Sequence, residues 1–167
     1  MIESETVVLG VGSPLMGDDG LGVEVVETLS RRWADTPELQ FLDGGVWGMR
    51  ILPHIESAKR LLIVDVIRAG RVPGALVRLE RDEIPRHLRA KLSPHQIDLS
   101  EVLALAELRD TFPPEAVALG IEPVRVEMYE ELSPAVRATV PQLIEAIERQ
   151  LAEWGHALEP REEVARA

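Results

Sequence analysis

Short runs of apolar residues alternate along this 167-residue chain with segments that have the spacing of an amphipathic helix. The runs at 6–10, 39–42, 60–64 and 116–121 are rich in valine, leucine, isoleucine and alanine, a composition that favours short buried strands. Runs that are apolar almost throughout indicate strands covered on both faces, as in parallel sheets. The alternation therefore predicts an α/β fold.

Helices are expected between and after these runs. Apolar residues recur at helical spacing over 19–34, and a short helix is expected over 49–56. A capping box at Asp98 begins another helix. The last helical region extends over 133–154, with a kink or a restart expected at Pro141 because proline cannot donate a backbone hydrogen bond.

One further strand-like segment, residues 74–80, differs from the others. It follows Pro73 and a short connection, so we expect it at a sheet edge or antiparallel to its neighbour. The predicted fold is a three-layer α/β sandwich, with a mostly parallel twisted sheet of about five strands and helices on both faces. Residues 1–154 are expected to form a single domain, and the polar residues 155–167 a disordered tail.

The charge balance limits the kinds of partner. Eighteen lysines and arginines against 29 aspartates and glutamates give a net charge of −11, which argues against binding to nucleic acids or anionic membranes. The absence of cysteine excludes disulfides, thiolate nucleophiles and cysteine metal ligands. Residues 1–5 are acidic, unlike a signal peptide, and every apolar run is too short to span a bilayer. We therefore expect a cytoplasmic protein.

The stretch from about Arg68 to Lys91 is the only one with a net positive charge. It is either a solvated loop with weak local ion pairs or a docking surface for an acidic segment of a partner. The sequence leaves both interpretations open.

A glycine-rich loop, residues 10–20, follows the first strand. It departs from a dinucleotide-binding loop because Leu15 occupies the third glycine position. It has the glycine spacing of a P-loop, but Asp18 and Asp19 replace the lysine and the hydroxyl residue that would bind phosphate and magnesium. The loop thus disfavours a nucleotide. A nucleotide-binding enzyme stays a weaker alternative, since Asp43 could bind a ribose.

In doubly wound folds the ligand site lies at the carboxyl ends of the strands, which here indicates residues 10–19, 43–48 and Asp65. Asp19, Asp65 and the loop residue His95 are a candidate set of two oxygen ligands and one nitrogen ligand, suited to nickel or zinc. Each also has a plainer interpretation: a helix-start acid, a strand-end turn residue and a solvated histidine, respectively. Spacing alone does not establish that the three converge.

Five blocks of sequence resemble the hydrogenase maturation proteases, in the order that this family has them over about residues 6–154. They are residues 8–22, Asp43-Gly44-Gly45-x-x-Gly48, Ile63-Val64-Asp65, Ser93-Pro94-His95-Gln96 and Gly120-Ile121-Glu122-Pro123. Five ordered blocks are far more specific than a single glycine loop.

The resemblance implies an endopeptidase that removes a C-terminal extension from the large-subunit precursor of a nickel–iron hydrogenase, after nickel has been inserted. It assigns the metal contacts to Asp19, where the family has Asp or Glu, and to Asp65 and His95. The nickel is expected to be carried by the substrate, with no nucleotide cofactor, and the protein to be a monomer. Ser13 and Val46 depart from the family, which usually has Asn and often Thr at these positions.

No serine–histidine–acid order is apparent, so the predicted chemistry is metal-assisted hydrolysis with Asp19, Asp65 and His95 as catalytic residues. The metal could polarise the scissile carbonyl or activate a bound water, or one carboxylate could serve as the general base. Gly44 and Gly45 would leave the backbone open for an extended substrate peptide, or they form a plain tight turn. The alternative function is a non-catalytic nickel-sensing assembly factor for the same subunit.

Overall fold

Five strands form one mixed sheet at the centre of the computed structural model, which describes residues 5–44, 48–84, 99–128 and 131–162. The strands are β1 (Thr6–Gly10), β2 (Leu39–Asp43), β3 (Arg60–Val66), β4 (Leu76–Glu80) and β5 (Glu115–Ile121). Their order across the sheet is β2-β1-β3-β5-β4. The first four strands in this order are parallel, and β4 pairs antiparallel with β5. The predicted sheet and its antiparallel edge strand are confirmed.

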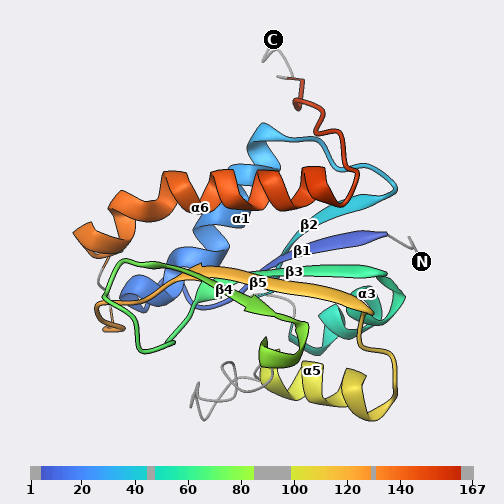
Figure 1. Ribbon diagram of the computed structural model, residues 1–167, viewed down its shortest axis with the longest axis horizontal. Coiled ribbons are helices and arrows are strands. Elements are labelled where there is room, and N and C mark those ends of the chain that lie inside the picture. The colour runs from blue at the N-terminus through green and yellow to red at the C-terminus, as the bar shows by residue number, and fades with distance from the viewer. Residues whose placement is uncertain (1–4, 45–47, 85–98, 129–130, 163–167) are drawn as a thin grey trace.

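Helices cover both faces of the sheet, as expected. The α-helices are α1 (Leu21–Arg32), α3 (Leu52–Ser57), α5 (Leu99–Leu108) and α6 (Pro134–Glu153), and short 3-10 helices are η1 (Gly17–Gly20), η2 (Gly48–Ile51) and η3 (Arg81–Glu83). Figure 1 shows α1 and α6 on one face and α3 and α5 on the other. The three-layer sandwich is therefore present.

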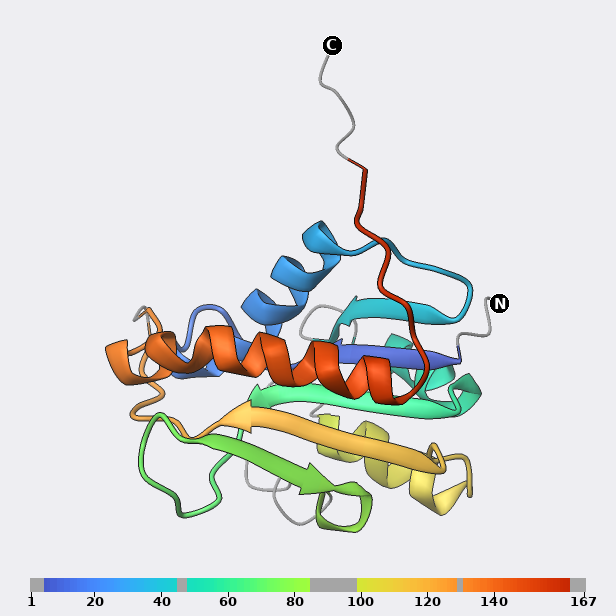
Figure 2. The same cartoon turned by 45° about the horizontal axis from the view of Figure 1, so that its top comes forward.

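Burial along the strands follows their place in the sheet. All residues of β1 are buried, and β3 is buried at every position after Arg60 because both strands are covered on both faces. In β4 buried and exposed residues alternate, which is the pattern of an edge strand with one face on the core. Figure 2 shows the β3 and β5 arrows pointing to one side of the molecule and β4 to the other.

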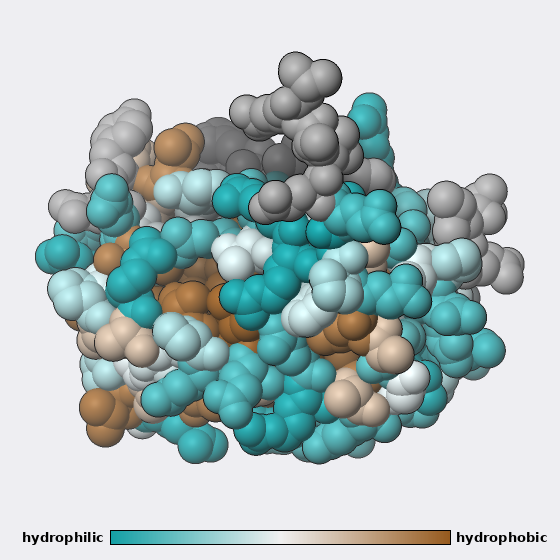
Figure 3. Space-filling model, turned by 90° about the horizontal axis from the view of Figure 1, so that it is seen from above, coloured by the Kyte–Doolittle hydropathy of each residue, from teal (hydrophilic) through white to brown (hydrophobic). Residues whose placement is uncertain are grey.

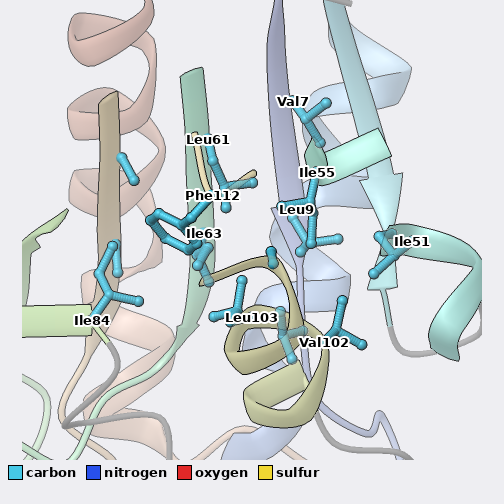
Figure 4. Close-up of a cluster of buried hydrophobic side chains, with 14 of the residues drawn as sticks. Val7, Leu9, Ile51, Ile55, Leu61, Ile63, Ile84, Val102, Leu103 and Phe112 are labelled. Carbon is cyan, nitrogen blue, oxygen red and sulfur yellow. The ribbon is translucent and has the colours of Figure 1, made fainter. Parts of the chain in front are cut away.

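The sheet separates two hydrophobic clusters. One lies beneath α3 and α5, where Leu9 and Ile63 point toward Val102 and Leu103 of α5 (Figure 4). The other lies beneath α1 and α6; its fully buried members include Leu29 of α1, Leu62 of β3 and Leu143 of α6. These two clusters hold the carboxyl ends of the parallel strands at one edge of a rigid sheet.

Gly22 lets the start of α1 lie directly on the sheet. A Cβ atom on this residue would come within 2.2 Å of the Val64 carbonyl oxygen and 2.4 Å of the Val11 carbonyl oxygen. Because both of these atoms belong to the backbone, no side-chain adjustment would relieve the contact. Glycine at this position therefore sets the distance between α1 and strands β1 and β3.

Helix α6 continues through Pro141 as a single element, so the expected restart is wrong. Pro141 lies on the exposed side of the helix, while Leu143 and Ile144 in the next turn are buried against the sheet. On that side water can bond to the carbonyl that has lost its backbone partner. Packing of the apolar face therefore outweighs the local preference of proline to end a helix.

The chain after α6 packs on the domain as far as Arg161, instead of fraying from residue 155. Pro160 forms an antiparallel bridge with Trp33. The backbone N–H of Ala34 donates to the Glu159 carbonyl at 2.8 Å, and that of Arg161 donates to the Arg32 carbonyl at 3.0 Å. These partners at the end of α1 are distant in sequence, so local composition gave no sign of them.

His156 joins this segment to the amino end of the sheet. Its Nε2 and the hydroxyl of the buried Thr6 are hydrogen-bonded at 2.6 Å. Burial lowers the pKa of His156 below its ordinary value of 6.5, and Arg60 lowers the pKa further; together they outweigh the opposing effect of Glu5 and Glu38. The folded protein therefore favours the neutral imidazole.

This pKa shift predicts a loss of stability on mild acidification. Below a pH of about 6.5 the unfolded state binds a proton at His156 more readily than the folded state does, so the free energy of unfolding falls as the pH is lowered. Urea unfolding at pH values of about 7.5 and 5.5 measures the fall. In His156→Gln, the free energy of unfolding is expected to differ less between the two pH values than in the wild type. If the variant showed the same difference in free energy as the wild type, this role for His156 would be ruled out.

The surface over α1 and α6 is mostly hydrophilic, with apolar side chains visible in small areas between polar ones (Figure 3). Strongly exposed large apolar residues include Leu15, Val72, Leu108, Val124 and Met128, all of which lie in loops or at a helix end. Among the described residues, no helix is long and apolar enough to cross a membrane.

Candidate functional site

The strand order places a topological switch point at the carboxyl ends of β1 and β3. From β1 the chain passes to β2 on one side, and it then returns to β3 on the other side of β1. The connections after β1 and β3 therefore diverge to opposite sides of the sheet's carboxyl edge, and the divergence leaves room for a ligand. Asp19 follows β1, and Asp65 lies near the end of β3.

Asp19 belongs to η1, which folds back against the end of β1. The backbone N–H of Ser13 donates to Oδ2 of Asp19 at 2.9 Å. Gly12, with a φ of 110°, lies so close to η1 that a Cβ atom would be 2.0 Å from the Asp19 carbonyl oxygen. The half-buried carboxylate of Asp19 is thus held by the backbone of the loop. Its bond comes from the backbone of Ser13, so it does not depend on which side chain occupies position 13.

Asp65 is only 1% exposed, although it carries a carboxyl group. The backbone N–H of Val66 donates to its Oδ1 at 2.8 Å. The preceding residue, Val64, accepts a hydrogen bond from the Val11 backbone N–H at 3.1 Å, one residue before Gly12. The loop that leads from β1 to Asp19 therefore lies against β3 next to Asp65, and both acids lie at the carboxyl edge of the sheet, Asp19 in η1 and Asp65 in β3.

Asp18 is fully buried, and its carboxylate is bonded to a distant part of the chain. Its carboxylate accepts hydrogen bonds from the backbone N–H groups of Val124, Arg125 and Ser133 at 2.7–3.0 Å, and from the Ser133 hydroxyl at 2.9 Å. Burial would raise the pKa of Asp18, but these hydrogen bonds outweigh burial and hold the pKa below its ordinary value. Asp18 thus ties η1 to the segment between β5 and α6.

Glu122 is a third buried acid at this edge, after Asp65 and Asp18, and it was not singled out as a site residue. It is 8% exposed and follows β5 directly. Its Oε2 accepts a hydrogen bond from the Ala69 backbone N–H at 2.7 Å. Glu122 therefore fixes the loop after β3, which carries the exposed Arg68 and Arg71. The sequence signal was its place in the block Gly120–Pro123.

His95, Gly45 and Val46 lie outside the described residues, so the structure does not test their assignments. A search of the described part of the chain finds no group of three or more histidine, aspartate or glutamate residues placed to hold a metal ion. Gly44 packs over the end of β1, where an added Cβ atom would lie 2.7 Å from Cδ1 of Leu9. This contact accounts for glycine at position 44 by packing, and a role in substrate binding stays a prediction.

The doubly wound sheet, with two carboxylates near its switch point, defines an α/β protein of the class that generally binds its ligands at the carboxyl edge of the sheet. A model of the hydrogenase maturation protease family matches residues 23–150. The chain belongs to the hydrogenase maturation protease family and is a peptidase.

Similar proteins match over nearly the whole chain. A hydrogenase expression/formation protein HupD from Thiocapsa roseopersicina is 36% identical over 163 residues, covering 96% of this chain and 74% of that protein. The hydrogenase 2 maturation protease of Escherichia coli K12 is 33% identical over 159 residues, and the match covers 95% of this chain and 97% of that protease. The solved structure of the maturating endopeptidase HybD from E. coli has a TM-score of 0.83 and 33% identity, covering 94% of this chain and 98% of HybD.

Proposed function

We propose that this peptidase removes a C-terminal extension from the large-subunit precursor of a nickel–iron hydrogenase, after nickel has been inserted. The family supports the choice of substrate, since the relatives are named as hydrogenase maturation proteases and a maturating endopeptidase. The observation that carries the proposal is the pair of carboxylates at the carboxyl edge of the sheet, Asp19 in η1 after β1 and Asp65 in the neighbouring strand β3.

The two carboxylates and His95 are proposed to engage the nickel that the precursor carries. Oxygen and nitrogen donors suit a divalent ion of this kind. Asp65 is held rigidly because it is buried and its Oδ1 is bonded to the Val66 backbone. Asp19 is held by the Ser13 backbone and is half-buried, so it is the more exposed of the two acids. Recognition of the metal would restrict cleavage to precursors that have already been loaded.

Two routes to the attacking water fit this arrangement. Nickel in the substrate can polarise the scissile carbonyl or lower the pKa of a bound water. Alternatively, one of the carboxylates accepts the proton of the water as general base. A cysteine nucleophile is excluded by composition. In either route Asp19 and Asp65 position the substrate and supply negative charge next to the scissile bond.

The experiment compares nickel-loaded and nickel-free precursor. Each is incubated with the purified protein, and the intact mass of the large subunit is followed with time. We expect the loaded precursor to shorten by a single C-terminal fragment and the nickel-free precursor to keep its full mass. Shortening of both forms would contradict the nickel requirement. A precursor that binds the protein but never shortens would instead identify a non-catalytic assembly factor.

A further inference from the structure

We propose that Asp18 is a positioning residue for cleavage. It fixes η1 to the segment that leads from β5 to α6, and thereby holds the Asp19 carboxylate in the position needed for the reaction. The inference rests on the proposed function, because it gives Asp19 a part in the reaction. Asp18 itself is fully buried and bonded to the protein, so its action on the substrate is indirect.

The contacts of Asp18 all reach to the distant end of the chain. Oδ2 accepts from the backbone N–H groups of Val124 and Arg125 at 2.9 and 3.0 Å, and Oδ1 accepts from the backbone N–H of Ser133 at 2.7 Å. The Ser133 hydroxyl adds a fourth hydrogen bond to Oδ2 at 2.9 Å. One carboxylate thus binds two separate places in the β5–α6 connection, residues 124–125 and Ser133.

The backbone of η1 adds contacts to the same segment. The Asp18 N–H donates to the Arg125 carbonyl at 3.3 Å. At Gly17, with a φ of 61°, an added Cβ atom would be 3.3 Å from the backbone nitrogen of Glu127. The residue next to Asp19 is therefore enclosed by residues 124–127 on one side, while Ser13 holds the Asp19 carboxylate on the other.

The far end of this connection is rigid. Ser133 is the N-cap residue of α6, and its carbonyl accepts from the Arg137 N–H at 2.8 Å. Helix α6 begins directly after Ser133 and buries Val136 and Leu143 against the sheet. Asp18 therefore transmits the fixed position of α6 to η1, one residue away from Asp19. A displacement of a reacting group by about 1 Å can cost a rate factor of about 10², so this support matters for catalysis.

A carboxylate is needed here rather than its amide. In Asp18→Asn, one oxygen would be replaced by an NH₂ group that faces backbone N–H donors, and at least one of the four hydrogen bonds would be lost. We expect η1 to shift and kcat for nickel-loaded precursor to fall about 10-fold or more, with KM changed much less. Ser133→Ala, which removes only the hydroxyl bond, should lower kcat less and is a milder test if Asp18→Asn folds poorly.

The experiment measures kcat, KM and Tm for the wild type, Asp18→Asn, Ser133→Ala and the control Ile147→Val. Ile147 is a buried residue in the second half of α6, 14 residues after Ser133, so its variant should lower Tm without lowering kcat at temperatures well below Tm. Asp18→Asn is also combined with Asp19→Glu, which keeps a carboxylate at position 19. We expect the effects of the two substitutions on kcat to be non-additive, because both change the position of the carboxylate at residue 19.

The outcomes separate this inference from the proposed function. If the wild type does not shorten the precursor, the proposed function fails. If the wild type cleaves and Asp18→Asn lowers Tm while its kcat stays unchanged, as with Ile147→Val, then Asp18 is a purely structural residue. Additive effects with Asp19→Glu would also overturn the positioning role. A selective loss of kcat together with non-additivity supports it.

Discussion

Asp19→Asn leaves the nickel-loaded precursor at full length, with a cleavage rate lowered by about 10² or more. The amide keeps the size of the side chain but removes its negative charge, so it binds the substrate's metal weakly and cannot accept a proton from water. The fold should survive, because Asp19 is half-buried and its described side-chain hydrogen bond, from the Ser13 N–H, can be accepted by the remaining oxygen. Intact-mass measurement of the precursor with time gives the rate.

The matched control is Asp82→Asn, which removes the same charge from an exposed carboxylate in η3. It should cleave at the wild-type rate, which separates the loss of a site residue from the change in net charge. His95→Ala is expected to fail in the same way as Asp19→Asn. Normal processing by both variants would remove these two residues from the site.

Gly22→Ala is expected to destabilise the protein by about 3 kcal/mol, although alanine normally stabilises a helix relative to glycine by about 1 kcal/mol. The added methyl group would lie 2.2 Å from the Val64 carbonyl oxygen and 2.4 Å from that of Val11. To relieve these contacts, α1 must move away from β1 and β3, which opens the cluster under α1 and α6. Because Val64 and Val11 flank Asp65 and Gly12, the same movement should also impair cleavage.

Urea unfolding measures the loss, with Glu27→Ala as control at an exposed position of the same helix. The control changes helix propensity without touching the sheet, so its free energy of unfolding should stay within about 0.5 kcal/mol of the wild type. A Gly22→Ala variant as stable as the wild type would show that α1 is not held at this distance by glycine.

Much of the sheet could be predicted because its signals are local. The runs that became β1 and β3 are apolar almost throughout, and this pattern is the direct consequence of burial on both faces. The edge position of the segment after Pro73 followed from the missing donor of proline. Asp19 and Asp65 could be placed at one edge because parallel strands end on the same side.

Other features depend on partners that are distant in sequence. The donors to Asp18 lie more than 100 residues away, so sequence spacing could not reveal them. Tertiary contacts likewise decide the continuous helix through Pro141 and the packing of residues 155–161, with the sheet and with the end of α1 respectively. Local composition carries no information about such contacts.

The most direct test of the site is to locate a bound metal ion. The protein is titrated with cadmium, which has a strong anomalous signal, and the ion is then placed by crystallography. The account predicts one ion at the carboxyl edge of the sheet, bound by the carboxylates of Asp19 and Asp65 and by the imidazole of His95. An ion bound elsewhere, with Asp19 and Asp65 in contact only with protein atoms, would contradict it.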